Sequence, residues 1–252
     1  MTTDTRPIFF VHIMKTGGTT FKQIFLDSFG DGEIYPNGRD DTSALTAVTD
    51  ISYLRAISAE RLQRTRVFMG HFPYIASEFV GTPVRTMTML RHPVDRVISH
   101  IRQLRRGDSG WRRMSGLKDV ESPSLEAVYD DEFLKSVFLL NHQARMFAMT
   151  AEDDPKSYTD LIDMHEGRLE TACRHLERIE GLGILEDFDN FLADACTRFD
   201  LSTRSVEAQH VSTDKSPASE ELRERIAHEN ALDMAFYEHA RALVEARGGE
   251  TA

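Results

Sequence analysis

Apolar runs of strand length alternate with amphipathic segments along most of this chain. Residues 7–13 (PIFFVHI) are β-branched and aromatic, and they break into a lysine, a threonine and two glycines before an amphipathic stretch begins. A pattern of this kind predicts a strand, a tight loop and a helix in direct succession. Residues 84–90 repeat it, since their run stops at Arg91 and His92 ahead of a proline, which suits the first turn of a helix.

The same patterning predicts the remaining architecture. Four short strands alternate with helices, so we expect an α/β fold with a central parallel sheet flanked by helices and a helical carboxyl-terminal part. The other predicted helices cover residues 133–149, residues 155–178, a stretch capped by Asp187, and residues 217–249 with a break near Asn230. Predicted loops cover residues 31–50 and 107–124. We expect residues 1–6 and 248–252 to be tails and residues 7–247 to form a single domain.

The loop that follows residues 7–13 has the features of an anion site. Backbone N–H groups and the positive end of a helix dipole face whatever lies above such a junction. Gly17 and Gly18 permit close backbone approach, Thr19 and Thr20 add hydroxyl donors, and Lys15 adds a mobile positive charge. We therefore predict that the loop binds a phosphate-like anion. The alternative is a glycine-rich turn that only joins a strand to a helix.

This loop differs from the P-loop of nucleotidases. That motif places its lysine after the glycines, in the order G-x-x-x-x-G-K-[ST]. Here Lys15 precedes the glycines. A Walker A loop is therefore not matched.

The second junction offers a second anion clamp. Arg91 lies at the predicted carboxyl edge of a buried strand, where open α/β sheets bind ligands. Ser99 lies on the following helix, roughly two turns away. An arginine fork with a hydroxyl suits a second phosphate. The alternative makes Arg91 a salt-bridge partner at a strand end and Ser99 an ordinary helical serine.

Composition fits an enzyme with one substantial core. The chain has 252 residues, 40% of them hydrophobic, and a net charge of −11 from 30 basic and 41 acidic residues. An acidic chain is not a general nucleic-acid binder, so its cations must be concentrated locally to hold a polyanion. The arginine-rich segment 102–113 is one such concentration. It predicts either a basic flap over the cleft or a solvated loop.

Cysteine usage and hydropathy exclude several classes of protein. Cys173 and Cys196 both lie in helical patterns and are expected to be buried thiols, and no CxxC or Cys/His metal spacing occurs. The sequence shows no signal-peptide pattern and no apolar run long enough to span a membrane. We expect a cytoplasmic, bacterial protein without a membrane span.

Taken together, the two junctions resemble those of the PAPS-dependent sulfotransferases, closest to the carbohydrate (heparan sulfate 2-O-like) branch. MKTGGTT at 14–20 is similar to the family's PKTGSTS-like loop, and RHPVDRVIS at 91–99 is similar to its RHPxxRxxS pattern. Weaker likenesses continue to about residue 245, namely Gly70-His71, the N-x-Q-x-R pattern at 141–145, and the segments 181–188, 214–217 and 231–237.

The resemblance implies a P-loop-like domain and a set of site residues. PAPS (3′-phosphoadenosine 5′-phosphosulfate) would be the donor and PAP the product. The residues implied at the 5′-phosphosulfate are Lys15, Thr16, Gly17, Gly18, Thr19 and Thr20. Arg91 and Ser99 would hold the 3′-phosphate, and Lys215 and Ser216 would close over the nucleotide. No metal would be required, because cationic side chains neutralise the developing charge.

His71 is the candidate catalytic base. It follows Gly70 at the end of a predicted strand at 66–69, and an imidazole with an ordinary pKa of about 6.5 is suited to take the proton of a hydroxyl. Its position alone would also fit a capping or packing histidine. The family's Gly-His supplies its base, although the closest relatives carry His-Gly-His and position 69 is Met here. We therefore expect His71 to act without that second histidine.

Other polar residues are weaker candidates. The amphipathic stretch 133–149 contains His142 and Arg145, together with Asn141 and Gln143. These residues predict either an exposed polar face or a contact with substrate or cofactor. We interpret His12 as a core or supporting residue of the first strand and His92 as a packing neighbour of the nucleotide.

The sequence thus predicts a sulfotransferase that moves the sulfuryl group from PAPS to a hydroxyl of a carbohydrate or glycolipid-like acceptor. One alternative is a small-molecule kinase using ATP and magnesium, disfavoured by the position of Lys15 and by the lack of an obvious Walker B strand. The other is a non-catalytic module that binds PAP or another nucleotide.

Overall fold

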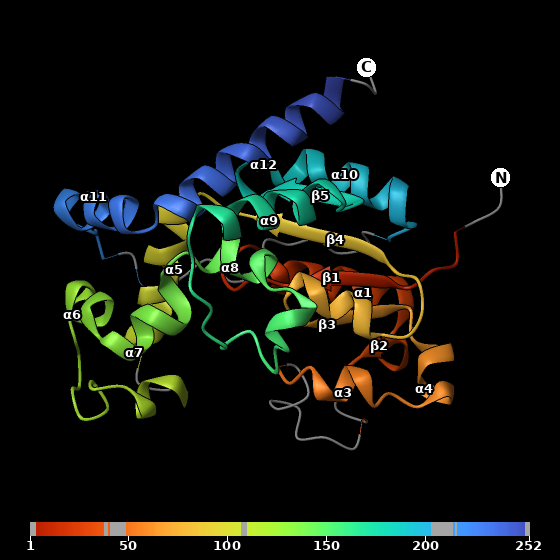
Figure 1. Cartoon of the computed structure of the whole chain (residues 1–252), viewed down its shortest axis with the longest axis horizontal. Coiled ribbons are helices and arrows are strands. Elements are labelled where there is room, and N and C mark those ends of the chain that lie inside the picture. The colour runs from red at the N-terminus through yellow and green to blue at the C-terminus, as the bar shows by residue number, and fades with distance from the viewer. Residues whose placement is uncertain are drawn as a thin grey trace.

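The fold is built on a central sheet of parallel strands. The computed structural model describes residues 4–37, 40, 49–106, 110–202, 214 and 216–249. Within these residues the sheet has five strands in the order β2-β3-β1-β4-β5 (Figure 1). The strands are β1 (Ile8–Val11), β2 (Ile34–Tyr35), β3 (Val67–Gly70), β4 (Arg85–Leu90) and β5 (Gly181–Ile184). All neighbouring strands pair in parallel, so the predicted α/β fold with a flanked parallel sheet is confirmed.

Helices connect the strands and cover both faces of the sheet. The α-helices are α1 (Gly18–Phe29), α3 (Ser52–Arg55), α4 (Ala59–Arg64), α5 (Pro93–Arg105), α6 (Leu125–Asp130), α7 (Glu132–Leu134), α8 (His142–Ala148), α9 (Glu166–Glu177), α10 (Phe188–Phe199), α11 (Glu220–Glu229) and α12 (Ala231–Gly249). Short 3₁₀ segments are η1 (Asp31–Glu33), η2 (Tyr74–Phe79), η3 (Gly110–Met114), η5 (Ala151–Asp153) and η6 (Leu185–Asp187), and η4 (Lys135–Leu139) is a single π-helical segment.

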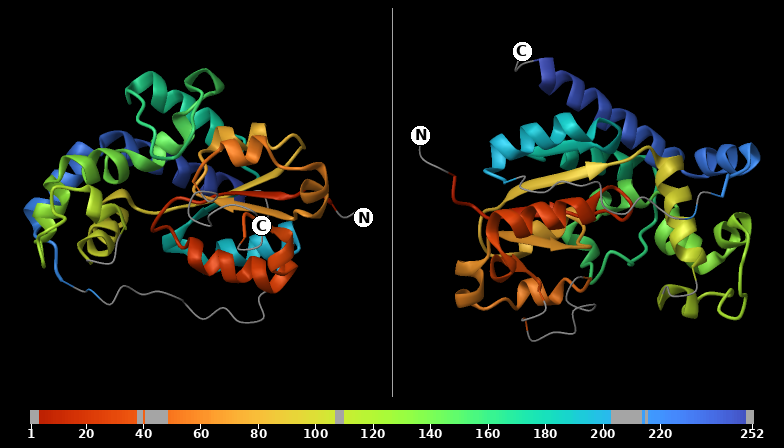
Figure 2. Two further views of the ribbon diagram at one scale, coloured as in Figure 1. Left: turned by 90° about the horizontal axis from the view of Figure 1, so that it is seen from below. Right: turned by 180° about the vertical axis from the view of Figure 1, so that it is seen from behind.

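Alternation along the strands separates two apolar layers. In β1, Ile8 and Phe10 pack with residues of α1 and α10, whereas Phe9 and Val11 pack on the opposite face with residues of η2, α8 and α9. Figure 2 shows α1 and α10 together on one side of the sheet. Because successive strand residues point to opposite faces, a run that is apolar throughout, such as residues 8–11, belongs to a strand covered on both sides.

The largest departures from the predicted elements lie outside the sheet core. The predicted helix 133–149 is interrupted, because η4 is followed by Asn141 at φ 44° before α8 begins. The predicted helix 155–178 is present only as α9, which begins at Glu166. Strand β2 falls inside the predicted loop 31–50, where two residues are too few to show a strand period. The predicted break near Asn230 is confirmed between α11 and α12.

The first residues described are held against the sheet. Arg6 donates hydrogen bonds to Glu180 (3.0 Å) and to the Val84 carbonyl (3.3 Å). No helix in the described ranges is both long and apolar enough to cross a bilayer.

Candidate active site

The loop between β1 and α1 has the backbone shape of an anion cradle. Gly17 precedes the first helical residue with φ 88°, a left-handed conformation that glycine adopts at little cost. Thr16 is fully buried, and its hydroxyl donates to the Ile13 carbonyl at 2.9 Å, which closes the loop. The Thr20 amide donates to the Gly17 carbonyl at 3.0 Å. Thr16 therefore shapes the loop through its side chain, while the first turn of α1 presents its positive end to the sheet edge.

Lys15 occupies a strained position in this loop. Its φ of 72° is left-handed, a region that costs a non-glycine residue free energy. Burial lowers the pKa of its ammonium group, and the positive charges of Arg106 and Arg91 lower it further. Positive charges gathered at one place are an arrangement that a bound anion stabilises.

Arg91 brings the second predicted anion clamp to the first. It follows β4, which lies next to β1 in the sheet, and its Nη1 donates to the Lys15 carbonyl at 3.3 Å. The Thr88 hydroxyl donates to the Val11 carbonyl at 2.9 Å, which ties the two strand ends together. The guanidinium of Arg91 and the predicted anion loop therefore lie together at the carboxyl ends of the parallel strands.

The Arg91 backbone is fixed by a residue from a distant helix. The side-chain amide of Gln143 donates to the Arg91 carbonyl at 2.8 Å, and its oxygen accepts from the Arg91 amide at 3.1 Å. Asp233 in turn accepts from the Gln143 and Ala144 amides, at 3.2 and 2.7 Å. Gln143 is one of the polar residues of the stretch 133–149 that could line the cleft. Asp233 was not predicted as a site residue, because its contacts with the amides of residues 143 and 144 join segments far apart in the sequence.

The carboxylate of Glu186 ties the segment of Arg91 and His92 to α12. Glu186 accepts a hydrogen bond from the His92 amide at 2.9 Å and from the Tyr237 hydroxyl at 3.0 Å. The ring of His92 also lies edge-on to that of Tyr237, with centroids 5.5 Å apart. The segments 181–188 and 231–237, singled out separately in the sequence, thus converge on residues 91–92.

Helix α5 carries Ser99 and also contacts Ser216. Ser99 is half-buried on α5. Farther along α5, Arg102 donates to the Ser216 carbonyl at 2.6 Å and Arg105 to the Ser216 hydroxyl at 2.8 Å. Lys215 lies outside the described residues. Two arginines of the basic segment therefore hold the loop around Ser216 beside the helix that carries Ser99.

His71 lies just beyond β3, at the same sheet edge. Its Nδ1 is 3.1 Å from the His12 carbonyl oxygen, and its ring stacks on the His12 ring with centroids 4.4 Å apart. Burial lowers the pKa of His71, an effect that the hydrogen bond to His12 partly opposes. Because a carbonyl only accepts, Nδ1 carries the proton of the neutral ring and Nε2 keeps the lone pair.

Met69 is part of the apolar layer beneath α1 and is only 7% exposed. It pairs with Phe10 in the register of β1 and β3. A side chain at this position therefore points into the layer below His71.

His142 and Arg145 are placed in the interior, 0% and 3% exposed. Arg145 donates to the Ser136 carbonyl at 2.7 Å and to the Val137 carbonyl, and its Nη2 lies 3.0 Å from Nδ1 of His142. Arg96 likewise donates to the Leu139 carbonyl at 3.0 Å. Arg96 and Arg145 therefore supply hydrogen-bond donors to the carbonyl groups of η4. Binding of the acceptor substrate by His142 and Arg145 stays a prediction, and their burial does not favour it.

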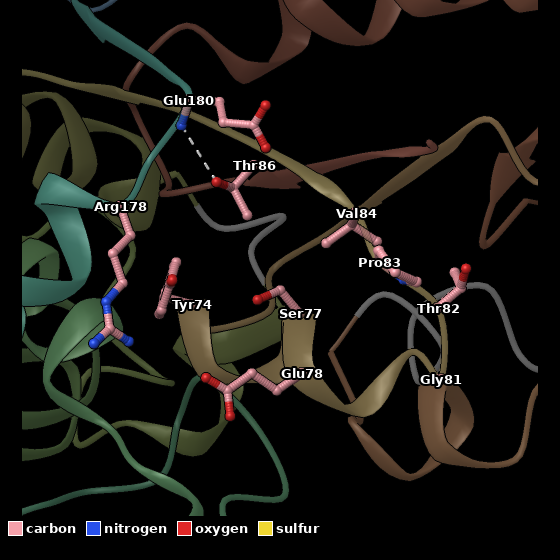
Figure 3. A pocket seen from close by; sticks show the side chains of 10 residues that line it. All are labelled: Tyr74, Ser77, Glu78, Gly81, Thr82, Pro83, Val84, Thr86, Arg178 and Glu180. Carbon is pink, nitrogen blue, oxygen red and sulfur yellow. Dashed lines mark hydrogen bonds between the residues drawn. The ribbon is translucent and has the colours of Figure 1, made fainter. Parts of the chain in front are cut away.

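A pocket of about 410 Å³ lies elsewhere, near the amino end of β4 (Figure 3). Glu78, Arg178 and Glu180 contribute both signs of charge to its lining, and the Glu180 amide donates to the Thr86 hydroxyl at 3.4 Å. None of the predicted site residues lines it. It lies at the amino end of β4, whereas Arg91 follows the carboxyl end of that strand, so we do not assign the predicted chemistry to this pocket. Among the described residues no group of three or more His, Cys, Asp or Glu side chains is arranged to hold a metal ion.

Comparison with known proteins identifies the family of this chain. The model of the sulfotransferase family matches residues 1–240. Among solved structures, the chain is similar to a sulfotransferase from Alicyclobacillus acidocaldarius at 16% identity and a TM-score of 0.46, with 95% of this chain and 96% of that chain covered. No curated protein matches. Since the family match extends over nearly the whole chain, this protein belongs to the sulfotransferase family.

Proposed function

We propose that this sulfotransferase uses PAPS as donor and transfers its sulfuryl group to a hydroxyl of a carbohydrate or glycolipid-like acceptor. The observation that carries the proposal is the hydrogen bond from the Arg91 guanidinium to the Lys15 carbonyl. It brings together, at one sheet edge, the two cationic elements that a nucleotide phosphorylated at both its 5′ and 3′ positions would need. The carbohydrate class of the acceptor rests on the resemblance of the motifs to the 2-O-like branch.

The residues present fit such a donor. In this proposal Lys15, the amides of residues 16–19 and the Thr20 hydroxyl hold the 5′-phosphosulfate at the positive end of α1. Arg91 and Ser99 hold the 3′-phosphate, and Lys215 and Ser216 close over the nucleotide. Lys15 carries a positive charge in a half-buried position among other cations, so a bound polyanion relieves their mutual repulsion.

The reaction then needs one proton acceptor and one site of charge stabilisation. The acceptor oxygen forms a bond to sulfur while the bond from sulfur to the 5′-phosphate oxygen breaks, and PAP leaves with the electron pair. Nε2 of His71 takes the hydroxyl proton as the new bond forms. Lys15 and the α1 amides stabilise the negative charge that builds on the departing phosphate.

Ligand-dependent thermal stability tests the donor assignment. We expect PAP to raise the Tm of the protein more than ATP, with or without magnesium, because a ligand that binds only the folded state stabilises it by mass action. Stabilisation by ATP and magnesium but not by PAP would indicate the kinase alternative. Binding of PAP without transfer from labelled PAPS to any of a broad panel of hydroxyl acceptors would indicate a non-catalytic module.

Arg91→Ala is expected to weaken PAP binding by roughly 10- to 100-fold, the loss typical of hydrogen bonds to a charged group. Adenosine 5′-phosphosulfate, which lacks the 3′-phosphate, should lose far less affinity. Titration calorimetry with both nucleotides measures the difference. Arg64→Ala, which removes an exposed arginine paired only loosely with Glu60 at 3.7 Å, is the matched control. Equal losses for the two nucleotides would refute the assignment of Arg91 to the 3′-phosphate.

A further inference from the structure

Two histidines from neighbouring strands meet at the candidate active site. The register of β1 and β3 pairs Val11 with Gly70, so the next residue on each chain is a histidine, His12 beside His71. Their rings lie 4.4 Å apart between centroids and are inclined by only 28°. We interpreted His12 as a core or supporting residue of the first strand, but β1 ends at Val11 and His12 lies just beyond it.

His12 is part of a continuous row of aromatic rings. Its ring stacks on that of Phe10 with centroids 5.7 Å apart, and the ring of Tyr158 lies 5.3 Å from that of His71, tilted by 45°. Phe10 is fully buried in the layer beneath α1. Because one end of the row is buried in the core, the plane of the His12 ring is fixed, and the His71 ring packs against it.

The start of α1 is shaped around the His12 ring. A Cβ atom on Gly18 would lie 1.8 Å from Nε2 of His12, a separation at which the ring would have to move. Glycine at this position therefore makes room for an imidazole between the sheet edge and the first turn of α1. This use of Gly18 is independent of any anion bound at the loop.

Two imidazoles at stacking distance in a largely buried place cannot both hold a proton without strong repulsion. Burial lowers the pKa of His12 well below its ordinary value, and the nearby charges of His71 and Lys22 lower it further. His12 therefore stays neutral beside a protonated His71.

We propose that His12 is a positioning residue for His71, a neutral imidazole that fixes the plane of the base and shields it from water, so that the two rings take up one proton between them. The inference rests on the proposed function of His71 as the base. The His12 carbonyl selects the Nδ1–H form of His71, and the His12 ring holds the remaining nitrogen, Nε2, in one direction.

The pH dependence of the rate tests this role. His12→Ala is expected to lower kcat about tenfold, because a loosely held base spends less time in the productive geometry. Its kcat/KM profile should also fall at a higher pH than that of the unaltered protein, since a more hydrated His71 binds a proton more readily. The inference would be overturned if kcat/KM of His12→Ala fell on the acid side (the acid limb of the profile) at the same pH as that of the unaltered protein.

A matched control separates positioning from general stacking. His175 also stacks on an aromatic ring, that of Tyr74 at 4.7 Å, and its Nδ1 lies 2.7 Å from a backbone carbonyl oxygen, that of Phe147. It lies in α9, away from the anion loop. His175→Ala should leave the acid limb unmoved, even if it lowers Tm.

A readout without turnover distinguishes failure of this inference from failure of the proposed function. Nuclear magnetic resonance titration of the His71 ring should show its pKa rising in His12→Ala and in Gly18→Ala, whose Cβ displaces the His12 ring. An unchanged His71 titration in both variants would overturn the inference while leaving His71 as base. Full activity in His71→Ala would instead refute the base assignment itself.

Discussion

His71→Ala is expected to lower kcat by about 100- to 10,000-fold, the usual contribution of a positioned general base. An alcohol is a poor nucleophile while it holds its proton. His71 lies just beyond β3, and the His12 carbonyl fixes its Nδ1 at 3.1 Å. PAP affinity should change little, because in the proposed site the imidazole faces the acceptor rather than the phosphates. Single-turnover transfer from labelled PAPS, with PAP binding measured in parallel, provides the test.

The pH dependence of the unaltered protein follows from the same residue. Burial lowers the pKa of His71, and a base works only in its unprotonated form, so the rate should be fully present near neutrality. It should fall only as the pH drops below the ordinary histidine value of about 6.5. In His71→Ala the remaining rate should lose this acid limb. His228→Ala, an exposed histidine of α11, is the control, and a collapse of PAP affinity in His71→Ala would indicate a structural histidine.

Lys15→Ala is expected to lower kcat by about 100- to 1,000-fold, comparable to the removal of one preorganised donor from an oxyanion site. The Lys15 ammonium lies where burial and two arginine charges already disfavour its protonated form. A cation in that setting gains most when negative charge develops next to it, which happens as the bond from sulfur to the phosphate oxygen breaks. The loss should therefore fall more heavily on kcat than on the Kd for PAP.

Two further variants make this result specific. Lys15→Met keeps the length of the side chain without its charge and should be as slow as Lys15→Ala. Lys156→Ala removes an exposed lysine that pairs with Asp154 and should be neutral. If Lys15→Ala retains the full rate, the assignment of the loop between β1 and α1 to the transferring group is wrong.

The network behind the site explains why several dispersed motifs occur in one sequence. Asn141 donates from its amide to the Asn230 side chain at 2.7 Å and accepts at its own side chain from the Asp233 amide at 3.0 Å. Asp233 is fully buried, and burial raises its pKa while Arg96 opposes that effect. Through Gln143 this polar interior reaches the Arg91 backbone. The position of the Arg91 backbone therefore depends on Asp233 of α12, which is far from it in the sequence.

The local elements of the site were well predicted, and their partners were less so. The glycine loop, the proline at the start of α5 and the strand ending at Leu90 all follow from short-range patterns. Arg145 was less well predicted. The helical spacing of polar residues in the stretch 133–149 suggested that it lies on a polar face, whereas its guanidinium donates to the carbonyl groups of η4. An interrupted helix leaves carbonyl groups that need donors, and a buried arginine can meet that need as readily as a ligand can.

What the sequence by itself determined is the order of strands, loops and helices around the two clamps, together with the chemical types of their residues. Backbone period, glycine and proline act over a few residues, so they can be read locally. Only the tertiary structure decided which clamps and rings meet. The contact of Arg91 with Lys15 and the stacking of His12 on His71 depend on β1 lying between β3 and β4 in one register. Strand order and register are set by packing across the whole core rather than by any one segment.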